Sequence, residues 1–117
     1  MRGRKVVAMP FRNLPTEAAA PLASLIDARS GQVSSMALTR LGDPVSATLL
    51  AFAAGESVSE EVYPGDTLYL VAEGTVGIAF ADRRVAMAAG EVLMVPAGVE
   101  HAVEPQGAAK LLQVCLA

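Results

Sequence analysis

The sequence holds one cysteine, one histidine and few aromatic residues, which make up 4% of the chain. Cys115 has no second cysteine with which to form an internal disulfide, and it lies in the apolar run that ends the sequence. We therefore expect a buried, unreactive thiol in a reducing cytoplasm. No apolar run reaches the roughly 18 residues that a membrane-spanning helix requires, so we expect no membrane partner.

Charge is also scarce, and it carries a slight negative excess. Charged residues make up 18% of the chain and the formal net charge is −3, which gives no basic surface for a nucleic acid. The one basic cluster is Arg2, Arg4 and Lys5. We interpret it as a solvated terminus rather than an arm that binds a nucleic acid or a membrane surface, and we predict no nucleic-acid partner.

Apolar residues, in contrast, are abundant. They make up 53% of the 117 residues, which is enough for one domain with a compact core built from Val, Leu, Ala and Met. So small a domain with so little charge has apolar side chains that it cannot hide by itself. This composition favours a buried interface between subunits, and we expect a homodimer.

Residues 1–30 are predicted to form an N-terminal arm, and residues 31–117 a β-barrel. Within the arm, Thr16 resembles an N-cap that opens a helix, and Leu22, Leu25 and Ile26 are spaced to form its apolar face. Pro21 inside this pattern limits the helix to short pieces. We expect the arm to pack on the barrel or on a partner subunit.

The rest of the chain alternates between apolar and polar residues in short runs separated by Gly, Pro and Asp. Such a pattern predicts eight or nine short antiparallel strands in a sandwich or jelly roll. The runs are 33–40, 45–53, 67–73, 76–80, 84–87, 92–95 and 109–116, with another strand opening at His101.

The stretch GEVLMVPAGVEH, residues 90–101, joins a strand, a tight turn and the single histidine. It resembles the second motif of the cupin family, G-x5-P-x-G-x2-H, at Gly90, Pro96, Gly98 and His101. This resemblance implies an all-β fold, the double-stranded β-helix or jelly-roll barrel of a small single-domain cupin, with a short, partly helical N-terminal arm.

The first cupin motif, G-x5-H-x-H-x3,4-E-x6-G, keeps its glycines in this chain and loses its metal ligands. Gly55 and Gly74 match, but Glu61 and Tyr63 occupy the two histidine positions and Thr67 the glutamate position. Glu61, Asp66 and His101, with Tyr63 as a fourth ligand, would make a poor site of one nitrogen and several oxygens. We expect no metal and no other cofactor.

His101 is open to two interpretations. A lone histidine in an apolar barrel is commonly a structural group whose ring nitrogens are hydrogen-bonded. Alternatively, His101 pairs with Glu61 as an acid/base dyad suited to proton abstraction next to a carbonyl, as in an isomerase or epimerase. Glu61 and His101 are therefore the candidate catalytic residues.

Three functions remain open: a metal-free cupin that binds a small molecule, an acid/base or metal-assisted enzyme, and a dimeric accessory or regulatory module with a vestigial pocket. We predict the first. Its narrow pocket is expected inside the barrel, lined by Glu61, Tyr63, Thr67, Tyr69, Val71, Met94, His101 and Val103.

Overall fold

The computed structural model describes residues 11–117; the basic cluster of Arg2, Arg4 and Lys5 lies outside them. Among the described residues, no helix is long and apolar enough to cross a membrane. Within residues 11–117, a single 3-10 helix, η1, precedes seven antiparallel strands. The elements are η1 Leu22–Leu25, β1 Val33–Ala37, β2 Val45–Phe52, β3 Val58–Glu61, β4 Thr67–Ala79, β5 Arg84–Ala88, β6 Val92–Val95 and β7 His101–Leu116.

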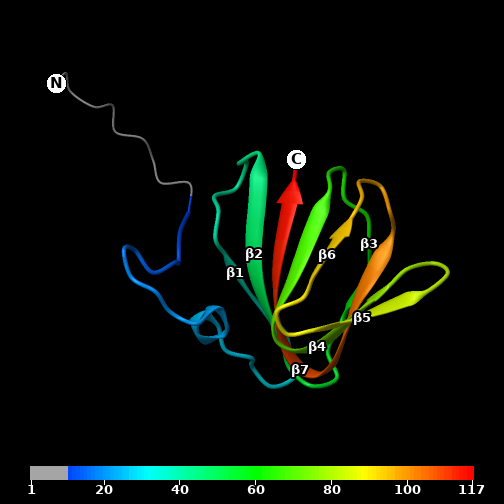
Figure 1. Cartoon of the computed structure of the whole chain (residues 1–117), viewed down its shortest axis with the longest axis horizontal. Coiled ribbons are helices and arrows are strands. Elements are labelled where there is room, and N and C mark those ends of the chain that lie inside the picture. The colour runs from blue at the N-terminus through cyan, green and yellow to red at the C-terminus, as the bar shows by residue number, and fades with distance from the viewer. Residues whose placement is uncertain (1–10) are drawn as a thin grey trace.

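Strands β4 and β7 are long, and each runs through both layers of the barrel (Figure 1). In one layer the order is β1-β2-β7-β4-β6, formed by the second part of β7 and the first part of β4. In the other layer the first part of β7 and the second part of β4 pair with β3 and β5. Two antiparallel layers that share bent strands form a jelly roll, as the sequence predicted.

The number of strands differs from the sequence prediction for two reasons: two expected turns lie within strands, and β3 was not among the predicted runs. Gly74 in β4 has φ of 83° and Gly107 in β7 has φ of 80°, and the register between the two strands shifts around Glu73. Glycine adopts such angles at little cost, so the chain bends and changes layer without ending the strand. The predicted runs 67–73 and 76–80 are therefore one strand, β4.

The interior of the barrel has two different ends. At the closed end, where β4 and β7 bend, apolar side chains fill the space between the layers. At the open end, β4 begins, and β7 both begins and ends (Figure 1). The buried cluster consists of Phe52, Tyr69, Val71, Val76, Ile78, Met87, Val95, Val103, Ala109 and Leu111.

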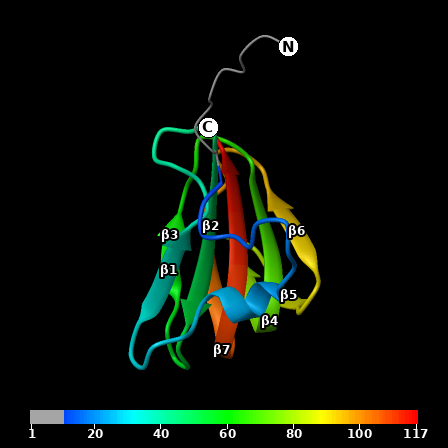
Figure 2. The same ribbon diagram turned by 90° about the vertical axis from the view of Figure 1, so that its left-hand side faces the viewer.

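The outer face of the first layer carries a second apolar cluster, which η1 covers (Figure 2). Leu22, Leu25 and Ile26 pack against Leu38 and Leu49, which are 4% and 0% exposed. The predicted apolar face of the helix is thus correct, but its start is not. Residues 16–20 are not helical; within residues 11–30 the single helical turn follows Pro21 rather than running through it.

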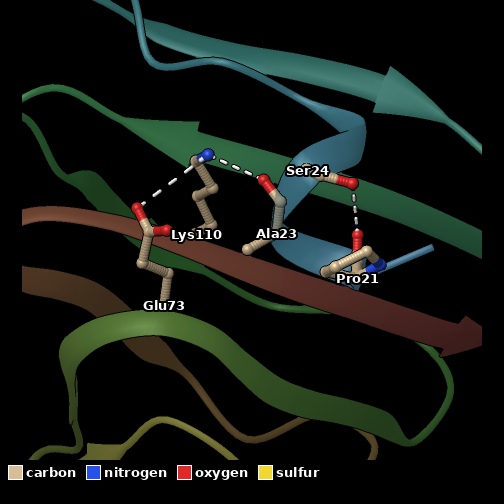
Figure 3. A network of polar contacts seen from close by, with 5 residues as sticks. All are labelled: Pro21, Ala23, Ser24, Glu73 and Lys110. Carbon is tan, nitrogen blue, oxygen red and sulfur yellow. Dashed lines mark hydrogen bonds and ion pairs between the residues drawn. The ribbon is translucent and has the colours of Figure 1, made fainter.

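Lys110 fixes the arm to the sheet (Figure 3). Its ammonium group donates a hydrogen bond of 2.7 Å to the carbonyl oxygen of Ala23 in η1, and lies 3.9 Å from the Glu73 carboxylate. The hydroxyl of Ser24 donates to the carbonyl oxygen of Pro21 at 2.7 Å, which closes the helical turn. The arm is therefore attached over the β2–β7 part of the outer face.

Candidate functional site

The loops of the two motifs meet at the open end of the barrel. The Asp66 carboxylate accepts a hydrogen bond of 2.9 Å from the Ala97 amide, and the Tyr63 carbonyl oxygen accepts one of 2.9 Å from the Gly98 amide. Gly98 has φ of 78°, as the Pro-x-Gly turn predicted. Asp66 is therefore occupied in joining the two loops, which holds the start of β7 in place.

His101 opens β7 and points into the barrel, where its side chain is 1% exposed. The Nδ1 atom lies 3.0 Å from the carbonyl oxygen of Val99, which can only accept, so Nδ1 carries the proton. In the tautomer with its proton on Nδ1, the Nε2 atom is the acceptor, and the Tyr69 hydroxyl donates to it at 2.7 Å. This bond joins the two layers, because Tyr69 comes from the part of β4 that pairs with β6.

The predicted acid/base dyad is not formed. Glu61 lies directly opposite His101 in the register between β3 and β7, so the two side chains emerge on the same face. Both ring nitrogens of His101, however, have other partners, and no ion pair joins the ring to a carboxylate among residues 11–117. The structural interpretation of His101 accounts for its surroundings.

The metal site that cupins commonly carry does not fit these residues. The Nε2 lone pair that would bind a metal ion accepts the Tyr69 hydroxyl proton instead. Thr67, at the position of the motif glutamate, donates to the Cys115 sulfur at 3.5 Å. No group of three or more His, Cys, Asp or Glu side chains gathers within the described part of the chain in a way that would hold a metal ion.

Two tyrosines surround the histidine ring. The Tyr69 ring packs edge-on against it at 5.5 Å between centroids, and the Tyr63 ring lies at 6.0 Å. Burial raises the pKa of the Tyr69 hydroxyl far above 10.0, and the nearby Tyr63 hydroxyl raises it further. Burial also raises the pKa of Tyr63, opposed by a hydrogen bond with Gln113 and assisted by the charge of Glu61. Both hydroxyls therefore stay neutral donors at physiological pH.

A hollow of about 260 Å³ lies beside this cluster at the open end of the barrel. Tyr63 is the only one of the eight predicted pocket residues that lines it. Gln113 and Cys115 line it from β7, and the Gln113 amide donates to the Cys115 sulfur at 3.2 Å. The remaining lining residues are Asp43, Ser46, Pro64, Leu116 and Ala117.

The sequence prediction did not include Ser46, Gln113 and Cys115 among the pocket residues. The alternation of side chains along β7 could have identified Gln113 and Cys115. Leu111 is fully buried in the interior, so Gln113 and Cys115, two and four residues later in the same strand, face the same side. Cys115 is only half-buried and borders the hollow, which corrects the prediction of a buried thiol.

The other predicted pocket residues fall into three groups. Five residues point into the interior but are at most 2% exposed, so they form packed walls rather than a lining: Thr67, Tyr69, Val71, His101 and Val103. Glu61 is half-buried at the edge of the same end. Met94 is a correction: it is 54% exposed on the outside of the barrel, because its neighbour Val95 points inward.

A larger hollow of about 520 Å³ lies elsewhere, between the arm and β1. It is lined by residues of both, including Asp27, Arg29 and Ser35, and by none of the motif residues. The smaller hollow lies at the open end of the barrel, next to the two motif loops and to the buried Tyr69–His101 pair. We therefore take the smaller hollow as the candidate site.

The geometry defines an antiparallel jelly-roll barrel that keeps the cupin turns and lacks the metal ligands of the first motif. The sequence model of the Cupin domain matches residues 48–115, and the chain belongs to the cupin family. A cupin superfamily protein from Desulfitobacterium hafniense is 51% identical, with a TM-score of 0.86 over 91% of this chain and 96% of that one.

Two further solved structures share the fold. A conserved Streptococcus pyogenes protein of unknown function has a TM-score of 0.87 at 20% identity, covering 95% of this chain and 96% of its own. A cupin 2 conserved barrel domain protein from Leptotrichia buccalis is 27% identical, with a TM-score of 0.76 over 82% of this chain and 46% of that one. None of the curated proteins matches the chain.

Proposed function

We propose that this cupin binds a small, uncharged polar molecule at the open end of its barrel, without a metal ion. The observation that carries the proposal is the hollow of about 260 Å³ bordered by Tyr63, Gln113 and Cys115. Ligand sites combine apolar walls with a few polar groups that fix orientation, and this hollow has both.

The size of the hollow limits the ligand. A water molecule occupies about 30 Å³ of liquid, so the hollow has room for roughly nine non-hydrogen atoms. This volume lies just below the range of about 300 to 1,000 Å³ that is usual for drug-sized ligands. The ligand class is therefore small metabolites rather than nucleotides or peptides.

The chemistry of the lining favours a neutral ligand. Gln113 offers both a donor and an acceptor, Tyr63 and Ser46 offer hydroxyls, and the hollow has no Lys or Arg among its lining residues. Asp43 borders it and Glu61 lies near the Tyr63 hydroxyl, so an anionic ligand would meet like charge. A molecule with an amide or hydroxyl groups satisfies these partners without that repulsion.

The test is a fragment titration of the full chain followed by amide chemical shifts. The set contains neutral fragments of up to nine or so heavy atoms and their anionic counterparts, for example succinamide beside succinate. We expect neutral members to shift the amides of Tyr63, Gln113 and Cys115, and the anions to leave them unmoved. A set in which no neutral member shifts these amides would contradict the proposal and favour the accessory module with a vestigial pocket.

A pair of glutamine variants separates the hollow from the rest of β7. Gln113→Leu removes the amide from the lining while keeping its bulk, and Gln106→Leu makes the same change at an exposed position of the same strand near the closed end. Binding of the neutral fragments should weaken at least about tenfold in the first variant, by loss of hydrogen bonds to the ligand, and stay unchanged in the second. Equal binding by the two variants would place the fragments elsewhere.

A further inference from the structure

Strand β1 is the outer strand of the first layer, and one of its edges has no neighbouring strand (Figure 1). Among the described strands, β1 pairs with β2 alone. Gln32 and Leu38, at either end of the strand, form their backbone hydrogen bonds on the β2 side. Because antiparallel residues alternate in this respect, the amide and carbonyl groups of Val33 and Ser35 point away from β2.

This open edge is short, because the chain closes it at both ends. At one end, the Asn13 side-chain amide donates to the Ala37 carbonyl oxygen at 2.7 Å. At the other end, the Gln32 amide donates to the Arg29 carbonyl oxygen at 3.2 Å, in the turn that joins the arm to β1. The open part is residues 33–36, a length of about 13 Å.

The hollow of about 520 Å³ lies along this edge, between β1 and the arm. Ser34 and Met36 belong to one face of β1 and Ser35 to the other, yet all three line the hollow, so it extends around the edge of the strand. Its far wall is fixed, because the Lys110 ammonium group bonds to the Ala23 carbonyl oxygen (Figure 3). At about 30 Å³ for each water molecule, it has room for roughly 17 non-hydrogen atoms.

The arm brings two opposite charges to the hollow. Asp27 and Arg29 line it, and Ala28 between them does not. Both charged residues are exposed, and within residues 11–117 neither forms an ion pair. Two residues apart in an extended chain, they are separated by at most about 7 Å along the backbone. Leu25 and Ile26, which are half-buried, come just before them and form an apolar wall.

We propose that this hollow, which we name the edge site, binds a zwitterionic dipeptide as a short added strand. The peptide group of the ligand pairs with the outward backbone groups of Val33 and Ser35. Its ammonium group pairs with Asp27 and its carboxylate with Arg29, since the ends of an extended dipeptide are also about 7 Å apart. The first side chain of the dipeptide then lies near the apolar wall.

The closed ends of the edge select a dipeptide over a longer peptide or a strand of another protein. A longer chain would meet Asn13 at one end or the turn at Arg29 and Gln32 at the other. The edge site shares no lining residue with the candidate site at the open end of the barrel. The inference therefore goes beyond the proposed function, and each of the two can fail without the other.

The test is a titration of the full chain with leucylalanine, followed by amide chemical shifts. We expect the amides of Val33 and Ser35 to shift, and those of Tyr63 and Gln113 to stay in place. N-acetyl-leucylalanine lacks the ammonium group and leucylalanine amide lacks the carboxylate. Each should bind about fivefold more weakly than the free dipeptide, which is the upper end of the range for an exposed ion pair.

Two variants test the assignment of the charges. Arg29→Gln should weaken binding of the free dipeptide about fivefold and leave binding of leucylalanine amide unchanged. Asp27→Asn should weaken the free dipeptide similarly and leave N-acetyl-leucylalanine unchanged. Arg40→Gln is the matched control, because Arg40 is exposed in the connection between β1 and β2, outside the hollow, and it should bind all three ligands as the wild type does.

Three outcomes would overturn the proposal. Free leucylalanine at millimolar concentration could leave the Val33 and Ser35 amides unmoved, or it could shift those of Tyr63 and Gln113 instead, which would place it at the open end of the barrel. Equal losses in Arg29→Gln and Arg40→Gln would show a general effect of charge. Circular dichroism verifies that the variants are folded, and a variant that merely disturbed the arm would weaken all three ligands alike.

Discussion

The closed and open ends of the barrel are built from the same strands and stabilised by different means. Around Phe52, Val76 and Leu111 toward the closed end, side chains with no polar atom are 0% exposed. At the open end the strands supply Tyr69 and His101, which bond each other, and Thr67 and Gln113, which both donate to the Cys115 sulfur. Among residues 11–117, no buried side-chain nitrogen or oxygen lacks a hydrogen-bond partner.

This difference separates the part of the barrel that maintains the fold from the part that we propose binds a ligand. Apolar packing requires only that the volume be filled, so the closed end contributes stability without selecting a ligand. Each polar group of the open end needs a partner of fixed geometry, which specifies the arrangement around His101. The groups at the border of the hollow, Tyr63 and Gln113, are only half-buried and remain accessible to a small molecule.

The largest expected effect lies at the closed end. Phe52→Ala removes a fully buried ring from the main cluster and leaves a cavity that the neighbouring strands cannot fill. We expect the free energy of unfolding to fall by about 3 to 5 kcal/mol, measured by chemical denaturation. A loss below about 1 kcal/mol would mean that this end is loosely packed, and the contrast between the two ends would disappear.

The fold was accessible from the sequence because its signals are local. Glycine and proline mark turns wherever the backbone needs their angles, and four motif glycines, at positions 55, 74, 90 and 98, have φ between 78° and 89°. Alternation then locates the strands between them. The same reasoning divided β4 and β7 wrongly, because a glycine that bends a strand and one that ends it look alike in sequence.

The contacts of the site were less accessible because they are not local. Tyr69 and His101 are separated by 32 residues, and only the folding of one layer over the other brings them together. The resemblance to cupins directed attention to Glu61 as the partner of His101, yet a hydroxyl from the facing layer occupies that nitrogen. Met94 was misplaced for a simpler reason, since the inward side of β6 is set by Val95.

The second prediction concerns the bond that joins the two layers at the open end. Tyr69→Phe keeps the ring and removes the hydroxyl, which leaves the Nε2 atom of His101 buried without a donor. We expect a loss of about 1 to 3 kcal/mol in the free energy of unfolding, smaller than the loss for Phe52→Ala. Tyr63→Phe is the control, because its half-buried hydroxyl can be replaced by water, and it should cost less. If the two tyrosine variants were equally stable, the bond to His101 would have no special role.

The smallest effect is expected from ionisation of the tyrosines at alkaline pH. Burial raises the pKa of Tyr63 and Tyr69 above the value of 10.0 that they have in the unfolded chain. The folded state therefore holds these protons longer, and its advantage is complete below pH 10 and declines as the pH rises toward the folded pKa. The melting temperature of the wild type should therefore fall as the pH rises above 10. It should fall less steeply with pH in Tyr63→Phe and in Tyr69→Phe. Phe52→Ala should show the same slope of melting temperature against pH as the wild type. Tyrosinate absorbance, followed over the same pH range, identifies the tyrosines that ionise. If the melting temperature fell equally steeply with pH in all variants, residues other than the tyrosines of the open end would govern alkaline unfolding.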